Sequence, residues 1–171
     1  YQHLYQPQAQ AFIRAILGGQ IGKISIVKGV GLWARGRAYY TRNNWAGKLR
    51  TEKGWILDSP VNNALAHYLN LICYFGGTTP DEMVEVDTLE ASFYRANPEI
   101  ESFDTAFLKM KSVDGLDLLF VTSHVAQDNL EPRIEIVGDL GRITWTQGAY
   151  TVSIPGTPDQ QVDMPSQEQI R

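Results

Sequence analysis

Residues 103–125 read FDTAFLKMKSVDGLDLLFVTSHV, and this stretch decides the fold class. Residues 104–112 and 116–124 have the apolar content and the alternation of half-buried β-strands. Between them, Asp114-Gly115 is a strong signal for a two-residue hairpin turn. The stretch therefore predicts two antiparallel strands joined by a tight turn.

The segments around this hairpin continue the pattern. Further strands are predicted at 23–33, 83–95, 133–137, 142–146 and 149–154. The sequence GDLG at 138–141 and Gln147-Gly148 predict weaker turns. Sequential strands joined by short turns indicate an antiparallel meander. After Pro155 the chain is polar, and no strand or helix is predicted there.

Two helices are predicted, at 7–17 and 60–76; Gly18-Gly19 follows the first and Gly76-Gly77 closes the second, as suits a helix end. Ser59 is a good N-cap for the second helix, and Pro60 suits its first position. Two helices cover only one face of a sheet. We therefore expect an α+β fold, with an open-faced, mainly antiparallel sheet that carries two helices on one face. The uncovered face is a candidate partner surface.

The composition excludes several classes of protein. Of the 171 residues, 43% are hydrophobic and 20% are charged, which is typical of a globular domain. The formal net charge of −4, without a basic run, argues against binding to nucleic acid or to anionic membranes. We expect residues 1–171 to be a single domain, a fragment of a longer protein. A cytoplasmic location is favoured, although the single cysteine, Cys73, leaves the compartment open.

The second predicted helix has an unusual polar side. An apolar stripe is formed by Val61, Ala64, Leu65, Tyr68, Ile72 and Phe75. The opposite side carries an uncharged row of Asn63, His67, Asn70 and Tyr74. Imidazole and carboxamide groups suit hydroxyl ligands, and histidine transfers protons near neutral pH. We interpret the row as facing a ligand; the alternative is an ordinary solvated helix surface.

The segment before this helix has no apolar period from residue 34 to 54. It is rich in flat aromatic, amide and cationic side chains, namely Arg37, Tyr39, Tyr40, Arg42, Asn43, Asn44, Trp45 and Lys48. Aromatic faces stack on sugar rings, while amides and cations bind hydroxyls or carboxylates. A substrate loop is one interpretation. A surface loop anchored by Trp45 and Tyr40 is the other.

Other chemistry finds little support. The three histidines are far apart in sequence, and no group of residues has metal-ligand spacing, so we expect no metal. Ser123 and His124 are adjacent on a strand and point to opposite faces, so they cannot act as a nucleophile and its base. Gly29, Gly31 and Gly36 do not have the spacing of a dinucleotide fingerprint. We therefore expect no cofactor in this chain by itself.

Several segments together resemble the C-terminal domain of the Gfo/Idh/MocA family of NAD(P)-dependent oxidoreductases. They are YQHLYQPQAQAFIRAILGGQIGKISIVKG at 1–29, NNWAGKLRTEKGWILDSPVNNALAHYLNLICYFGG at 43–77, the hairpin at 103–125 and PRIEIVGDLGRITW at 132–145. The order of these segments is what carries the resemblance, which spans nearly the whole chain. The stretch LDSPVNNALAHYL resembles a bacterial subgroup.

The resemblance implies a two-domain enzyme. A Rossmann domain, absent here, would bind NAD or NADP, and this domain would shape the site for a sugar or polyol and form a homo-oligomer through its open sheet face. The family's catalytic lysine would lie upstream of Tyr1. The isolated fragment is then expected to be inactive.

The resemblance also assigns roles to residues. His67 matches the catalytic histidine when HYLN is aligned with the family's H-x-x-D, and Asn70 then stands at the aspartate position. A rival alignment begins at Asp58 and puts Asn62 at the histidine position. Asn63 and Asn70 would position hydroxyl groups, and the loop would clamp the sugar. The remaining substrate-binding candidates are Arg37, Tyr40, Arg42, Asn44, Trp45, Lys48, Asp58 and Asn62.

Two other functions stay open on the sequence. One is a non-catalytic module for carbohydrate binding or oligomerisation. The other is a glycosidase of the same family that uses NAD transiently.

Overall fold

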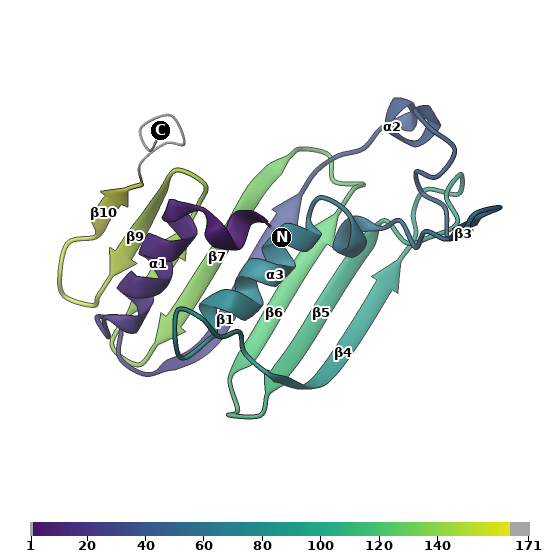
Figure 1. Ribbon diagram of the computed structural model, residues 1–171. Helices are drawn as coiled ribbons and strands as arrows, with labels where there is room; N and C mark the ends of the chain where they lie inside the picture. Colours follow the sequence, from purple (N-terminus) through teal and green to yellow (C-terminus); the bar gives the residue numbers. More distant parts are fainter. Residues whose placement is uncertain (1, 165–171) are drawn as a thin grey trace.

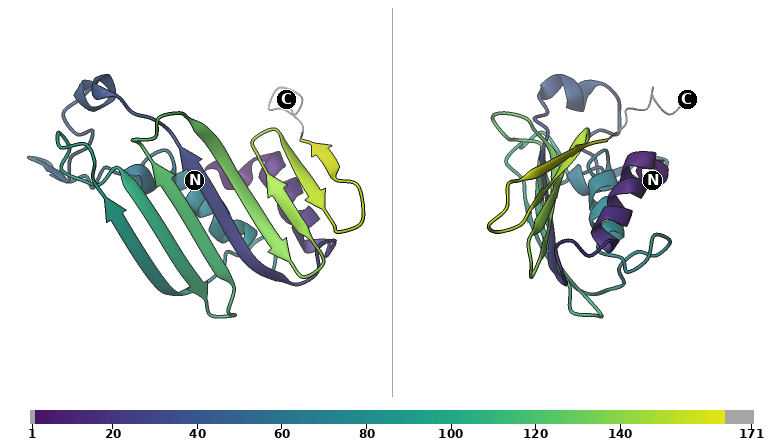
Figure 2. Two further views of the ribbon diagram at one scale, coloured as in Figure 1. Left: turned by 180° about the vertical axis from the view of Figure 1, so that it is seen from behind. Right: turned by 90° about the vertical axis from the view of Figure 1, so that its left-hand side faces the viewer.

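The computed structural model describes residues 2–164, which form one large sheet with helices on one face (Figures 1 and 2). The helical elements are η1 (Gln2–Tyr5), α1 (Pro7–Leu17), α2 (Arg37–Thr41), η2 (Pro60–Asn62) and α3 (Ala66–Phe75). The strands of the large sheet are β1 (Ile24–Leu32), β4 (Val86–Tyr94), β5 (Thr105–Ser112), β6 (Asp117–Ser123), β7 (Leu130–Gly138), β8 (Arg142–Trp145), β9 (Ala149–Ser153) and β10 (Gln160–Asp163). A separate two-stranded ribbon consists of β2 (Arg50–Thr51) and β3 (Gly54–Trp55).

The order of the strands departs from a simple meander. The large sheet runs β10-β9-β8-β7-β1-β6-β5-β4, so β1 lies between β6 and β7. It pairs in parallel with β6 and antiparallel with β7. The predicted meander is wrong at this point, because turn signals report only pairing between neighbours in sequence. The other hairpins are confirmed, including the one that turns at Gly115. The φ of Gly115 is 84°, which lies in the left-handed region that glycine adopts without steric cost.

The core lies between the sheet and the pair α1 and α3. Burial alternates along β5, where Ala106, Leu108 and Met110 are buried against the helical side. The helix α3 comes very close to β1 at Gly29, where an added Cβ would lie 2.5 Å from Ile72 Cδ1. Glycine at this position lets the helix and the strand pack in direct contact.

The other face of the sheet carries no helix, as Figure 2 shows. Ion pairs span neighbouring strands there, namely Lys28–Glu135 at 3.3 Å, Lys109–Glu90 at 3.5 Å and Lys111–Asp117 at 2.8 Å. Strand pairing places Val30, Val121 and Phe107 side by side on this face. The open-faced α+β architecture predicted from the sequence is confirmed.

Three local predictions need correction. The helix expected at 60–76 is split, because Asn63 leaves helical geometry (φ −128°, ψ −137°) between η2 and α3. The segment 34–54, for which no helix or strand was predicted, contains α2 and β2. Beyond Pro155, β10 adds an edge strand to β9 despite its polar sequence. Within residues 2–164, no helix combines the length and apolar character needed to cross a membrane.

Candidate functional site

The segment that follows β1 is fixed by local hydrogen bonds. The Asn43 side chain accepts hydrogen bonds from the backbone N–H groups of Trp45 and Ala46 at 3.1 and 2.8 Å. Gly47 then adopts a φ of 72°, and its carbonyl accepts a hydrogen bond from the Glu101 N–H at 2.8 Å. The predicted loop is therefore an ordered segment joined to the chain around residue 101.

Asp58 connects this segment to the start of the α3 region. Its side chain is 7% exposed. One carboxylate oxygen accepts the Gly47 N–H at 2.7 Å, and the other accepts the Asn63 amide at 2.7 Å. The Asn63 amide also donates to the Tyr39 hydroxyl at 2.9 Å. These hydrogen bonds join the segment from Tyr39 to Gly47, Asp58 and Asn63. The predicted helix is broken at Asn63, the residue that makes two of them.

Aromatic rings and arginines alternate along the segment, and we call these five residues, Trp33, Arg35, Tyr39, Arg42 and Trp45, the arginine–aromatic row. The Arg35 guanidinium carbon lies 5.5 Å from the Trp33 ring centre and 4.8 Å from that of Tyr39. The Arg42 carbon lies 3.8 Å from Tyr39 and 5.4 Å from Trp45. Both cations therefore share one tyrosine ring. Burial and then the Asp58 charge raise the pKa of Tyr39.

His67 lies in the first turn of α3 and stacks on a second imidazole. The His3 and His67 ring centres are 4.5 Å apart, with 13° between the planes. His3 also meets the Tyr68 ring edge-on, and Tyr68 meets Trp33 at 5.9 Å. The start of α3 is thus linked by ring contacts to the arginine–aromatic row. Burial lowers the pKa of His67, which keeps it neutral near pH 7.

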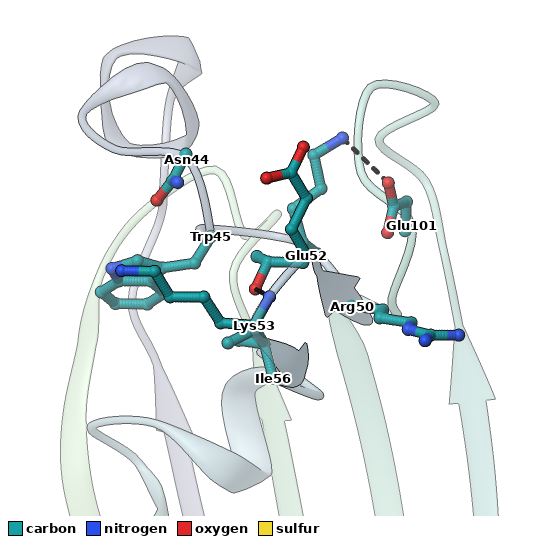
Figure 3. Close-up of a pocket in the computed structure, with 9 residues that line it drawn as sticks. Asn44, Trp45, Arg50, Glu52, Lys53, Ile56 and Glu101 are labelled. Carbon is teal, nitrogen blue, oxygen red and sulfur yellow. Dashed lines mark hydrogen bonds and ion pairs between the residues drawn. The ribbon is translucent and has the colours of Figure 1, made fainter.

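A shallow cavity of about 880 Å³ lies at the other end of this row (Figure 3). Its lining consists of Asn44, Trp45, Lys48, Arg50, Thr51, Glu52, Lys53, Ile56 and Glu101. Lys48 forms an ion pair with Glu101 at 2.9 Å, which lowers the pKa of the exposed Glu101 carboxyl. The cavity therefore offers an indole, an amide and several charged groups. His67 and Asn63 do not line it.

The other predicted site residues lie elsewhere. Arg37 reaches Glu99 on the surface at 3.9 Å. The buried Tyr40 hydroxyl has no hydrogen-bond partner among the described residues, and burial raises its pKa to about 12. Asn62 donates to the Leu57 carbonyl at 3.1 Å, so its amide stabilises a turn. Asn70 reaches the Met83 sulfur at 3.9 Å.

The uncharged row predicted on one helix is not continuous. Asn63 precedes α3, and Tyr74 is 4% exposed, so it belongs to the core. The Tyr74 hydroxyl donates to the Pro80 carbonyl at 2.9 Å and accepts from Gln10 at 2.8 Å. These contacts show that α1 and the segment after α3 cover this end of the helix. Only His67 and Asn70 remain on the predicted side of α3.

Sequence reasoning missed Trp33 and Arg35. Both residues come after Leu32, the last residue of β1. The sequence analysis assigned residues 23–33 to a strand from their apolar alternation and gave Trp33 no role in a site. The alternation of aromatic and arginine residues from 33 to 45 is visible in the sequence. Its irregular spacing matches neither a strand nor a helix, so only the folded chain shows that the rings and cations stack.

Metal-ligand clusters and the glycines of β1 were the remaining candidates for a cofactor site. No group of three or more His, Cys, Asp or Glu side chains is placed to hold a metal within residues 2–164. Gly29 and Gly31 lie inside β1 beneath α3, rather than in a turn before a helix N-terminus. These glycines therefore do not form the phosphate-binding turn of a dinucleotide fingerprint.

A family model described as the GFO/IDH/MocA C-terminal domain matches residues 9–144. The chain belongs to this family. The GFO/IDH/MocA assignment agrees with the open-faced sheet and with the resemblance found in the sequence. No curated protein matches the chain.

Solved structures of oxidoreductases have the same fold. The WlbA dehydrogenase from Bordetella pertussis, in complex with NADH and UDP-GlcNAcA, is 23% identical with a TM-score of 0.67, over 82% of this chain and 38% of that one. A levoglucosan dehydrogenase in complex with NADH is 16% identical with a TM-score of 0.75, over 95% and 46%. An oxidoreductase from Sinorhizobium meliloti is 18% identical with a TM-score of 0.69, over 95% and 42%. The GFO/IDH/MocA domain described here thus spans less than half of each of these proteins.

Proposed function

We propose that residues 1–171 form the substrate-binding and dimerisation domain of an NAD(P)-dependent oxidoreductase that acts on a sugar or polyol hydroxyl. The observation that carries the proposal is the position of His67. It lies at the start of α3, and ring contacts through His3, Tyr68 and Trp33 connect it to the arginine–aromatic row. The family assignment and the dehydrogenases among the similar structures support the same class of reaction.

His67 has the protonation state that alcohol oxidation needs. Because burial lowers its pKa, the imidazole is neutral at pH 7 and is able to accept the proton of a substrate hydroxyl. When bound in the parent enzyme, a nicotinamide supplies the hydride acceptor. Asn70, which matches the family's aspartate in the preferred alignment, is an amide and cannot accept a proton as a carboxylate does. His67 therefore handles the hydroxyl proton without a carboxylate from that position.

The segment from Arg37 to Lys48 is proposed to hold the sugar. Trp45 presents an indole to the cavity, and Asn44 and Lys48 add an amide and an ammonium group. Asp58 and Asn63 brace this segment from below through their hydrogen bonds to Gly47 and Tyr39. Such bracing fixes the position of the segment that is proposed to hold the sugar, and fixed orientation contributes strongly to catalysis.

Dimerisation is proposed to occur through the open face of the sheet. Val30, Val121 and Phe107 form an apolar strip there beside the cross-strand ion pairs. A face of this kind suits pairing with the same face of a second subunit.

The test uses the full-length protein that carries this domain with its nucleotide-binding domain. Reduction of NAD⁺ and NADP⁺ is followed by absorbance with a panel of sugars and polyols. The variant His67→Asn keeps a polar side chain but accepts no proton, so kcat should fall by about 10² or more. The comparison variant His3→Asn removes the stacked ring and keeps the proton acceptor, so it should lose less.

The pH profile separates loss of the base from loss of packing. In the wild type, kcat/KM should fall at acid pH as His67 becomes protonated, and this limb should be absent in His67→Asn. Absence of nicotinamide reduction with every substrate, or an unchanged His67→Asn enzyme, would contradict the proposal.

A further inference from the structure

The two cations of the arginine–aromatic row have no acidic partner among the described residues. The ion pairs found within residues 2–164 use Lys28, Arg37, Lys48, Lys109 and Lys111. Arg35 and Arg42 are in none of them. The Arg35 Nε is buried without a hydrogen-bond acceptor within that same part of the chain. A buried N–H group without a hydrogen-bond acceptor raises the free energy of the folded chain, and a bound anion that accepts its hydrogen bond would remove this penalty.

Nearby carboxylates are already engaged by other groups. Asp58 accepts hydrogen bonds from Gly47 and Asn63. Asp104 is fully buried and accepts the N–H groups of Ala96 and Asn97 at 2.8 and 2.7 Å. Both carboxylates take N–H groups as their hydrogen-bond donors, and no ion pair joins either of them to Arg35 or Arg42 among residues 2–164. Arg35 and Arg42 therefore keep guanidinium groups that make no ion pair within the described residues.

The aromatic rings hold both guanidinium groups in place. The same Tyr39 ring lies 4.8 Å from the Arg35 guanidinium and 3.8 Å from that of Arg42, so two like charges are kept near each other. Stacking occupies the faces of a guanidinium and leaves its N–H edge for hydrogen bonds. A planar fork of N–H donors matches the oxygens of a carboxylate or a phosphate.

We propose that Arg35 and Arg42 bind the oxyanion group of an acidic sugar, either a sugar carboxylate or a sugar phosphate. This inference rests on the proposed function, because it names the substrate class of the same site. Trp33, which supports Arg35, contacts Tyr68 next to His67, and Trp45, which supports Arg42, lines the cavity. A neutral sugar leaves both cations uncompensated and is a poorer ligand.

The test measures binding to the 171-residue chain by titration calorimetry and by NMR. The ligands are D-glucuronate, D-glucose 6-phosphate, D-glucose and inorganic phosphate. Acidic sugars should bind at least about tenfold more tightly than glucose, and their affinity should fall with added salt. Tighter binding of glucuronate identifies a carboxylate as the source of the charge, and tighter binding of glucose 6-phosphate identifies a phosphate. Both results support the proposal.

Variants separate recognition from a structural role. Arg42→Gln and Arg35→Gln should each reduce the preference for the acidic sugar over glucose by about tenfold. Arg42→Lys keeps the positive charge but lacks the planar pair of N–H donors, so it should retain only part of the preference for the acidic sugar. The control Arg14→Gln removes an exposed arginine of α1, on the same side of the sheet, and should leave the preference unchanged. Because Arg42 is exposed, its variants should keep the fold even if Arg35→Gln unfolds.

Equal affinities for glucuronate, glucose 6-phosphate and glucose would overturn the proposal. Loss of thermal stability in the arginine variants without any change in preference would also overturn it, since the row would then be only a structural support. Acidic-sugar binding without nicotinamide reduction in the full-length protein would retain the anion site and refute the proposed oxidoreductase. Oxidation of neutral sugars alone by the full-length protein would support the proposed oxidoreductase and refute the anion site.

Discussion

The buried imidazole of His124 should make the stability of the domain depend on pH. The residue follows β6 directly and is 4% exposed. Burial is the main cause that lowers its pKa from 6.5 to about 4, the charge of Arg35 adds to this, and Asp58 and Asp104 oppose it. Between these two pKa values, His124 is protonated in the unfolded chain and neutral in the folded chain. Stability is complete above pH 6.5 and decreases as the pH falls towards 4.

The magnitude follows from the two pKa values. Between pH 7 and pH 5 the linkage amounts to about 2 kcal/mol of unfolding free energy. Urea unfolding of the 171-residue chain at both pH values measures this difference, which His124→Gln should reduce by about 2 kcal/mol. Comparing the change with pH cancels any loss of packing in the variant. His3 and His67, whose pKa values are also lowered, act in the same direction in both proteins. An equal pH dependence in wild type and His124→Gln would refute the reasoning.

Two further predictions concern packing and assembly. Gly29→Ala should destabilise the domain by about 1–3 kcal/mol, because the new methyl group meets Ile72. The control Gly36→Ala should have little effect, because its methyl group meets nothing within 4 Å. Thermal unfolding of both variants measures the difference. Val121→Glu places a charge in the apolar strip of the open sheet face and should turn a dimer into a monomer of unchanged fold in sedimentation. A wild-type chain that stays monomeric at high concentration would contradict the second prediction.

Much of the fold is predictable because its signals are local. The helix at 7–17 begins and ends at the predicted residues, and the turns at 114–115 and 138–141 join the strands that they separate in sequence. The position of β1 was not predictable in this way. Its partners lie about 90 and 110 residues away, and nothing in its own sequence selects a parallel neighbour on one side and an antiparallel one on the other.

The break at Asn63 shows where a periodic pattern misleads. Val61, Ala64 and Leu65 keep helical spacing, so the sequence predicts one helix from residue 60. In the structure, the Asn63 amide bonds to Asp58 and Tyr39, and the chain leaves helical geometry to make these contacts. The local preference gives way to hydrogen bonds from a segment more than twenty residues earlier. The same contacts gather candidate residues that the pattern alone had placed apart.

The contact between His67 and His3 is equally invisible in the sequence, since the two residues are separated by the whole of α1 and β1. Neither histidine has the spacing of a metal site or of a catalytic pair. The sequence makes His67 a candidate through its position in the helix that resembles the family's. It could not show that a second imidazole covers the ring, or that this burial lowers the pKa of His67.

The parallel pairing of β1 with β6 explains why the candidate residues meet at one end of the sheet. Parallel strands bring their carboxyl ends to the same edge, so the residues after Leu32 and after Ser123 emerge side by side. Backbone hydrogen bonds continue this pairing, from the Trp33 N–H to the Ser123 carbonyl at 3.0 Å and from the Arg35 N–H to the His124 carbonyl at 2.8 Å. In a pure meander, β1 would lie at an edge, and Arg35 would have no such support. The non-local strand insertion thus both sets the topology and fixes the start of the arginine–aromatic row.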